Sequence, residues 1–205
     1  MTEPAPALSD APSSAELRPI DAPEDRLLEI LGGRAQPLFA LLDAARDYRV
    51  HALLAESGHE FQSLYEGAQG KELAEVAPYL VRLPAQSRLL EQLVRDGWGQ
   101  SWGVYLTSEG SFKGIRKQFR HFLMVKTEDG KELYFRFYDP RVLRVFLPTC
   151  GSSEAAEFFG PIRRFWCEHQ TPRVLLEFTL TEQGVVVEPS PLAEADDPAL
   201  LTAAR

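Results

Sequence analysis

The sequence predicts an α/β (α+β) fold: a mixed β-sheet with helices packed on its faces and with room for two lobes. Apolar runs of strand length and amphipathic stretches of helix length follow one another along the chain, without a regular βαβ alternation. Glycine or proline stands at many of their boundaries, as expected where such elements end. With 205 residues, 44% of them hydrophobic, the chain can form one globular domain with a substantial core.

The first half of the chain predicts a series of short helices and strands. Glycine is the residue that most often ends a helix, and Gly32, Gly58 and Gly97 each follow a predicted helix. Pro78 cannot donate a ladder hydrogen bond, so it marks either the first residue of its strand or an edge strand. The helices are expected at residues 25–31, 47–57 and 87–96, and the strands at residues 36–45, 61–65, 77–83 and 102–107.

The second half predicts a hairpin that leads directly into a helix. Asp129-Gly130 is a strong turn signal between strands at residues 120–127 and 132–138, because both residues accept positive φ. Asp139 is then the expected N-cap of a helix, and Pro140 its first residue, where a missing N–H costs nothing. The other expected elements are helices at residues 111–119, 141–147 and 153–157, a strand at 158–167, and a terminal hairpin at 174–180 and 185–187.

The formal net charge of −8 is concentrated at the two ends of the chain. Residues 1–25 contain six acidic residues and one arginine, and residues 188–205 contain four acidic residues and one arginine. Both ends are also rich in proline, alanine and serine, and they are predicted to be disordered tails. The body between them, residues 26–187, is electrically balanced, so nucleic-acid binding is not expected.

Several absences from the sequence predict a cytoplasmic protein without a metal or cofactor. There is no apolar run of about 18 residues, and the first residues lack the pattern of a signal peptide, so no membrane association is expected. Cys150 and Cys167 have no C-x-x-C spacing, and both are expected to be reduced thiols. The histidines show no metal-binding spacing, and neither a Walker loop nor a dinucleotide fingerprint is present.

One short motif is typical of an enzyme. Residues 99–103, Gly-Gln-Ser-Trp-Gly, match the G-x-S-x-G nucleophile elbow of serine hydrolases, and Asp139 and His169 follow in the hydrolase order. The elbow needs a strand that turns into a helix, whereas here a helix is expected to end at Gly97 and a strand to begin near Trp102. A helix-to-strand turn is therefore the favoured interpretation, and a serine hydrolase using this serine is an alternative.

The placement of the basic residues indicates a binding surface. Arg136 is a cation within an otherwise apolar strand. The helix expected at residues 111–119 and the residue after it carry a basic stripe at spacings i, i+3, i+4 and i+7: Lys113, Arg116, Lys117 and Arg120. Such a stripe is either a solvated helix face or a docking surface for an acidic partner. Trp166 belongs to a residue type that is enriched at interface hot spots.

Six segments of the chain occur in an order that is specific as a set. They are residues 41–45 (LLDAA), 63–67 (SLYEG), 77–81 (APYLV), 97–99 (GWG), 135–143 (FRFYDPRVL) and 158–161 (FFGP). Together they resemble the adaptor/chaperone domain family of type VI secretion effectors (Tap/Tec type), which is encoded beside the VgrG spike protein. The resemblance covers roughly residues 36–168, and the Arg-Phe-Tyr-Asp-Pro-Arg block at residues 136–141 is its most specific part.

The resemblance implies a cytoplasmic protein, not an enzyme, that binds a secreted effector and promotes its loading onto the VgrG spike. The adaptor-chaperone domain would occupy residues 26–187, between the two tails. The alternatives are the serine hydrolase described above and an immunity-type protein that binds a toxic domain. The candidate partner-binding residues are Arg136, Asp139, Arg141, Arg144, Lys113, Arg116, Lys117, Arg120 and Trp166.

Arg136 has two interpretations that the sequence leaves open. It is either an internal brace for Asp43 or Asp139, or an exposed anchor for the partner protein. The identity of the effector and the oligomeric state are equally open at this point.

Overall fold

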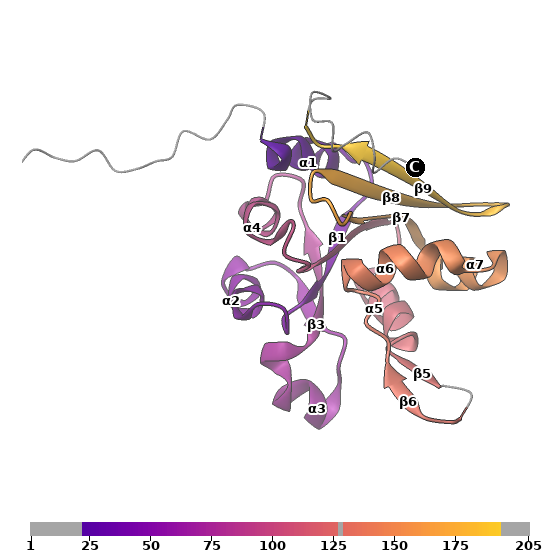
Figure 1. Cartoon of the computed structure of the whole chain (residues 1–205). Coiled ribbons are helices and arrows are strands. Elements are labelled where there is room, and N and C mark those ends of the chain that lie inside the picture. The colour runs from indigo at the N-terminus through magenta and orange to yellow at the C-terminus, as the bar shows by residue number, and fades with distance from the viewer. Residues whose placement is uncertain (1–21, 127–128, 194–205) are drawn as a thin grey trace, which may run out of the picture.

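A seven-stranded sheet runs through the part of the protein described by a computed structural model, residues 22–126 and 129–193 (Figure 1). Its strands lie in the order β2-β3-β1-β4-β7-β8-β9, and neighbouring strands pair antiparallel. The α+β class is confirmed, and the strands of this sheet are antiparallel rather than mixed in direction. They are β1 (Leu38–Asp43), β2 (Phe61–Ser63), β3 (Pro78–Leu83), β4 (Gly103–Ser108), β7 (Ile162–Glu168), β8 (Val174–Thr181) and β9 (Gly184–Pro191).

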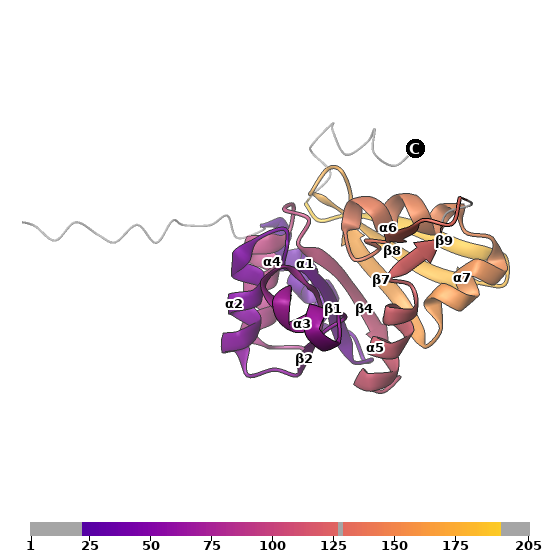
Figure 2. The same ribbon diagram turned by 90° about the horizontal axis from the view of Figure 1, so that it is seen from below.

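Helices cover both faces of this sheet, with α2 and α4 on one side of it and α6 and α7 on the other (Figure 2). Most begin where the sequence predicts, because a side chain accepts a hydrogen bond from the first turn: Ser87 and Ser111 cap two of them. The helices are α1 (Pro23–Gly32), α2 (Tyr48–Ser57), α3 (Gly67–Glu72), α4 (Arg88–Gly97), α5 (Phe112–His121), α6 (Pro140–Phe146) and α7 (Ser152–Phe159), with single 3-10 turns η1 (Ala74–Val76) and η2 (Leu147–Thr149).

The sheet separates two hydrophobic cores. Successive residues of a strand point to opposite faces, so Leu38, Ala40 and Leu42 of β1 lie in one core, while Phe39 and Leu41 lie in the other. The first core is closed by α1, α2 and α4. The second is closed by α5, α6 and α7 and is rich in aromatic residues, and we call it the aromatic core. Because β1 is buried on both faces and lies near the middle of the sheet, it holds its two ends in fixed positions.

A separate antiparallel ribbon, β5 (Met124–Lys126) and β6 (Glu132–Tyr134), extends from the end of α5 (Figure 1). Both strands are shorter than the sequence predicts. The predicted strand at residues 132–138 is wrong beyond Tyr134, because the Asp139 N–H donates to the Arg136 carbonyl at 3.0 Å and forms a turn. Phe137 in that turn is buried and stacks against Phe119 of α5 at 5.5 Å. The packing of this ring therefore outweighs the strand pattern of its segment.

Three other boundaries differ from the sequence predictions. Phe158 and Phe159 end α7 instead of beginning a strand, because both rings pack into the aromatic core from the helix. At the other end, β9 continues to Pro191, four residues into the segment predicted as a tail, and Leu192 is buried in the first core. At the N-terminal end of the chain, α1 begins at Pro23, inside the segment predicted as the N-terminal tail. Residues 1–21 and 194–205 of the predicted tails lie outside the described part of the chain. Among the described residues, no helix combines the length and apolar character needed to cross a bilayer.

Candidate partner-binding surface

A buried carboxylate and a half-exposed arginine meet at the end of β1. Asp43, the last residue of that strand, has a side chain only 1% exposed and accepts a hydrogen bond from Nη2 of Arg136, whose side chain is 43% exposed. Burial raises the pKa of Asp43, although Arg136 and the Ala45 N–H counteract that effect. Arg136 is thus a brace for Asp43, and nearly half of its side-chain surface is still exposed to solvent.

A second pair of the same kind lies next to the first. Asp139 caps α6 by accepting from the Arg141 N–H at 2.9 Å, and the Arg141 guanidinium donates to both of its oxygens at 3.0 and 2.6 Å. The Asp139 side chain is 3% exposed and that of Arg141 is 47% exposed. Burial alone would raise the pKa of Asp139, but the hydrogen bonds from Arg141 and the charges of Arg141 and Arg46 lower it below 3.8.

Arg136 and Arg141 are therefore each oriented by an ion pair with a buried carboxylate. Nη1 of Arg136 and Nη1 of Arg141 donate no hydrogen bond within the described part of the chain, and the two side chains are 43% and 47% exposed. A guanidinium that is already oriented loses little conformational entropy when it binds a further carboxylate. The arrangement suits recognition of an acidic group on a partner.

Tyrosine side chains join these pairs to the ribbon. The Tyr65 and Tyr138 hydroxyls are hydrogen-bonded to each other, and burial raises the pKa of both groups. The Tyr65 ring also packs edge-on against Tyr134 of β6, with ring centroids 5.7 Å apart. Tyr65 additionally lies close enough to Asp43 and Arg136 to feel the charge of each. The end of β1, the segment at residues 135–139 and the ribbon thus form one continuous surface.

The basic stripe of α5 divides into two parts. Arg116 donates to the Ser63 carbonyl at 2.7 Å and to Glu66 at 2.9 Å, and Arg120 contacts the same carboxylate at 2.5 Å. These two arginines fix the loop between β2 and α3 and leave only part of their surface to a partner. Lys113 and Lys117 are exposed and form no hydrogen bond or ion pair within the described residues.

The charges at this end of the sheet do not balance. Five cations lie here against four carboxylates, three of which are buried: Arg46, Arg116, Arg120, Arg136 and Arg141 against Asp43, Glu66, Asp139 and Glu168, whose charge acts on Arg141. The exposed part of the cluster is consequently positive, although residues 26–187 as a whole are balanced. We name this set the arginine cluster.

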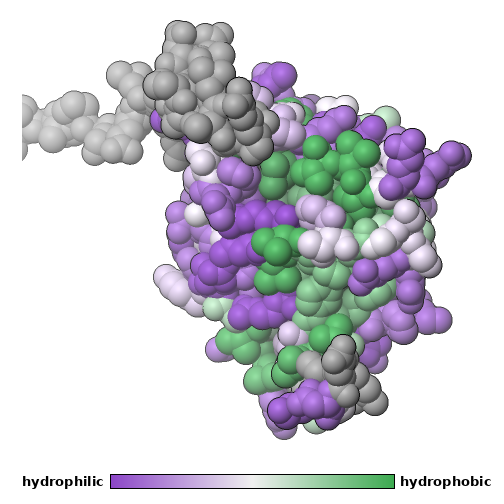
Figure 3. Space-filling model, turned by 45° about the vertical axis from the view of Figure 1, so that its right-hand side comes forward, coloured by the Kyte–Doolittle hydropathy of each residue, from purple (hydrophilic) through white to green (hydrophobic). Residues whose placement is uncertain are grey.

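The ribbon adds apolar surface beside the arginine cluster. Its large side chains are between 39% and 50% exposed: Met124, Val125, Leu133 and Tyr134. Figure 3 shows green, hydrophobic surface at the lower end of the molecule, where the ribbon lies. An apolar group of this size on a projecting element is typical of a protein-binding site. The sequence reasoning missed it, although apolar residues that alternate onto both faces of a short hairpin were its signal.

Two further candidates from the sequence have mainly structural contacts. Trp166 is fully buried in β7, where its Nε1 donates to Glu177 at 2.8 Å and the Arg34 guanidinium stacks on its ring at 4.9 Å. Its prediction as a partner contact is therefore wrong, because a central strand buries the ring on the α1 face. Arg144 of α6 is half-buried and donates to the Glu168 carbonyl at 3.4 Å.

The residues of the hydrolase motif form a tight loop around a buried carboxylate. Glu168 accepts from the Gly99 N–H at 2.6 Å, the Ser101 N–H at 3.1 Å and the Ser101 hydroxyl at 3.0 Å. Asp139 is occupied at the α6 cap, and His169 Nδ1 accepts from the Thr171 N–H at 3.1 Å. These contacts give Ser101 a structural role between α4 and β4, in which its positive φ of 58° belongs to the turn.

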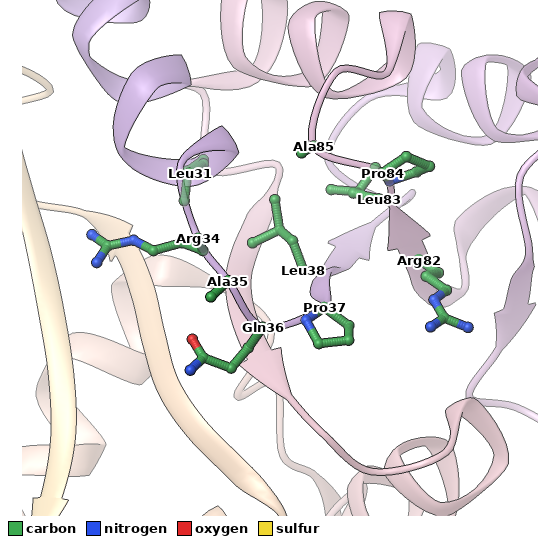
Figure 4. A pocket seen from close by; sticks show the side chains of 10 residues that line it. All are labelled: Leu31, Arg34, Ala35, Gln36, Pro37, Leu38, Arg82, Leu83, Pro84 and Ala85. Atoms are coloured by element: carbon green, nitrogen blue, oxygen red, sulfur yellow. The ribbon is translucent and has the colours of Figure 1, made fainter.

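A pocket lies at the opposite end of β1 (Figure 4). It has a volume of about 340 Å³ and is lined by the loop that enters β1 and the loop that leaves β3. Leu31, Leu38 and Leu83 are among its apolar lining residues. In Figure 4, Arg34 and Arg82 extend away from it on opposite sides. This pocket is separated from the arginine cluster by the length of β1, six residues or about 20 Å.

Comparison with known proteins identifies a family for the chain. Residues 38–157, more than half of the chain, match the family described as a domain of unknown function (DUF4123). No curated protein and no solved structure matches the chain. The matched segment runs from the first residue of β1 into α7, so it contains the ribbon and every arginine of the arginine cluster.

Proposed function

The chain belongs to the DUF4123 family, and from that premise we propose that it is a cytoplasmic adaptor-chaperone, not an enzyme, that binds a type VI secretion effector. The segments that resemble such adaptors lie mostly inside the matched region, including the block at residues 135–143. The effector is held on the arginine cluster and the ribbon, and the protein promotes its loading onto the VgrG spike.

One observation carries this proposal: a cluster whose exposed groups are mainly arginines lies beside a ribbon whose apolar side chains are about half exposed. Apolar contacts supply most of the binding free energy in protein interfaces, while charge-assisted hydrogen bonds fix orientation and exclude other partners. The arginine cluster and the ribbon lie at the same end of the sheet, and the two cores on either side of the sheet hold that end in place. The surface is therefore rigid where it carries charge and accessible where it is apolar.

An adaptor also needs room for the spike while the effector is bound. The pocket at the opposite end of β1 gives a concave apolar surface about 20 Å from the arginine cluster. A protein seated on the cluster would leave that pocket accessible. This geometry supports simultaneous contact with an effector and with VgrG.

Co-expression with the effector encoded beside the chain's own gene tests the proposal. We expect a stable complex on size-exclusion chromatography, more soluble effector than in its absence, and recovery of VgrG when all three are present. An effector that is equally soluble, and reaches the spike equally well, without this chain would overturn it. Truncated effectors separate this function from an immunity role, since an adaptor retains the loading region and an immunity protein retains the toxic domain.

A further inference from the structure

The ribbon presents two different apolar faces. Met124 pairs with Tyr134 across the ribbon, and Val125 pairs with Leu133, so each pair lies on its own face. A two-stranded ribbon is marginally stable unless one face packs against another element. Here the face with Tyr134 contacts Tyr65 at 5.7 Å and is still about half exposed. We call it the Tyr134 face.

The Tyr134 face continues into the arginine cluster. Tyr134 and Arg136 are two residues apart, and Tyr65 contacts the ring of Tyr134 while its hydroxyl is bonded to Tyr138. Tyr138 in turn lies close enough to Arg136 to interact with it electrostatically. A partner element on the Tyr134 face would therefore meet the exposed edge of Arg136 at the base of the ribbon.

From this geometry we propose that the segment bound at this surface is an acidic amphipathic segment of the effector. Its apolar side chains cover Met124 and Tyr134, and its carboxylates pair with the outer edges of Arg136 and Arg141 and with Arg46. This inference rests on the proposed function, because it specifies what kind of segment the adaptor recognises. The inference adds which residues of this chain contact the apolar side of that segment and which contact its acidic side.

The charge of the surface favours such a segment over a second copy of this chain. Two copies that met through the Tyr134 face would bring two clusters of excess positive charge together, which costs free energy. An acidic segment instead neutralises that excess. Because Asp43 and Asp139 already orient Arg136 and Arg141, the partner's carboxylates gain hydrogen bonds without ordering long side chains.

A charge reversal that leaves the buried pairs intact tests the charged half. Arg46 is exposed and forms no side-chain hydrogen bond within the described residues, so Arg46→Glu changes the surface without unpairing Asp43 or Asp139. Arg88→Glu is the matched control, because Arg88 is also exposed and lies at the start of α4, away from the arginine cluster. Titration of the full-length effector should give a Kd raised about tenfold or more by Arg46→Glu and unchanged by Arg88→Glu. The wild-type affinity should also fall with added salt.

A truncation on the ribbon tests the apolar half. Tyr134→Ser removes the ring from the Tyr134 face, and Val186→Ser on β9 removes a similarly exposed apolar side chain elsewhere. We expect Tyr134→Ser to raise the effector Kd about tenfold and Val186→Ser to leave it unchanged. Circular dichroism and thermal unfolding of each variant establish that the fold is retained.

The outcomes separate this inference from the proposed function. A tight wild-type complex that tolerates both Arg46→Glu and Tyr134→Ser overturns the inference and leaves the adaptor function standing. Failure of the wild-type chain to bind the effector overturns both. A wild-type dimer in light scattering that Tyr134→Ser converts to monomer overturns the inference in favour of a second copy.

Discussion

Two hairpins of this protein have similar local sequence signals but differ in how deeply their apolar side chains are buried. The ribbon β5–β6 and the terminal hairpin β8–β9 are both antiparallel, and each has a glycine with positive φ at its turn, Gly130 and Gly184. In the terminal hairpin, Leu175 and Phe178 of β8 are at most 1% exposed. In the ribbon, Leu133 is 50% exposed.

The difference comes from the neighbouring strand, not from the hairpins themselves. Strand β8 pairs with β7 along five residues and so joins the sheet between two cores. The strands of the ribbon pair only with each other within the described part of the chain. The buried apolar side chains of β8 therefore stabilise the fold, whereas those on the ribbon are available to a partner.

The largest expected effect is the loss of the buried ring of the terminal hairpin. Phe178→Ala leaves a cavity in the aromatic core, and we expect it to lower the free energy of unfolding by about 3–5 kcal/mol. Urea unfolding followed by tryptophan fluorescence measures this value. A loss below about 1 kcal/mol would show that β8 contributes no more to the fold than the ribbon does, and the comparison would fail.

Substitution of Arg136, at the base of the ribbon, should lower the free energy of unfolding more than substitution within the ribbon strands. Arg136→Met leaves the buried Asp43 carboxylate unpaired, and we expect it to lower the free energy of unfolding by about 2–4 kcal/mol, the low end reflecting the exposed edge of Arg136. Arg163→Met is the matched control. Its ion pair with Glu109 is more than 60% exposed on both sides, so its loss should cost less than about 0.5 kcal/mol.

The pH dependence of the Arg136→Met variant gives a second readout. Burial already raises the pKa of Asp43 above 3.8, and removal of Arg136 raises it further. A folded-state pKa above the unfolded value destabilises the fold at neutral pH, and this cost disappears as the pH falls through the folded pKa. The difference in stability between wild type and variant should therefore narrow on acidification. A gap that widens would mean that Asp43 is not the group left unpaired.

Local chemistry explains which parts of the fold the sequence predicts. The Asp139-Pro140 helix start is confirmed because a side-chain cap and a fixed φ act within a few residues. The prediction of a strand at residues 135–138 is wrong, because Phe137 packs in the core against Phe119 of α5. Strand order is likewise absent from the local pattern, since β2 and β3 pair with each other while β1 and β4 lie further in.

The candidate site shows the same limit. The sequence places Arg116 and Arg120 on one helix face correctly, but their contacts with Ser63 and Glu66 join residues at least 50 positions apart. Spacing alone therefore could not show that half of the stripe is used inside the molecule. The Asp43–Arg136 pair was one of two interpretations, because a cation in an apolar segment needs a partner that the local sequence does not identify.

The smallest expected effect is in strand β6 of the ribbon, and it tests the comparison most directly. Leu133→Ser removes an apolar side chain that is already half in water, so we expect the free energy of unfolding to change by less than about 0.5 kcal/mol. Leu175→Ser makes the same substitution in β8, where it buries a hydroxyl in the first core and should cost about 3 kcal/mol or more. If Leu133→Ser were as damaging as Leu175→Ser, the ribbon would be part of the folded core. Its apolar surface would then be unavailable to an effector, whatever the charges beside it.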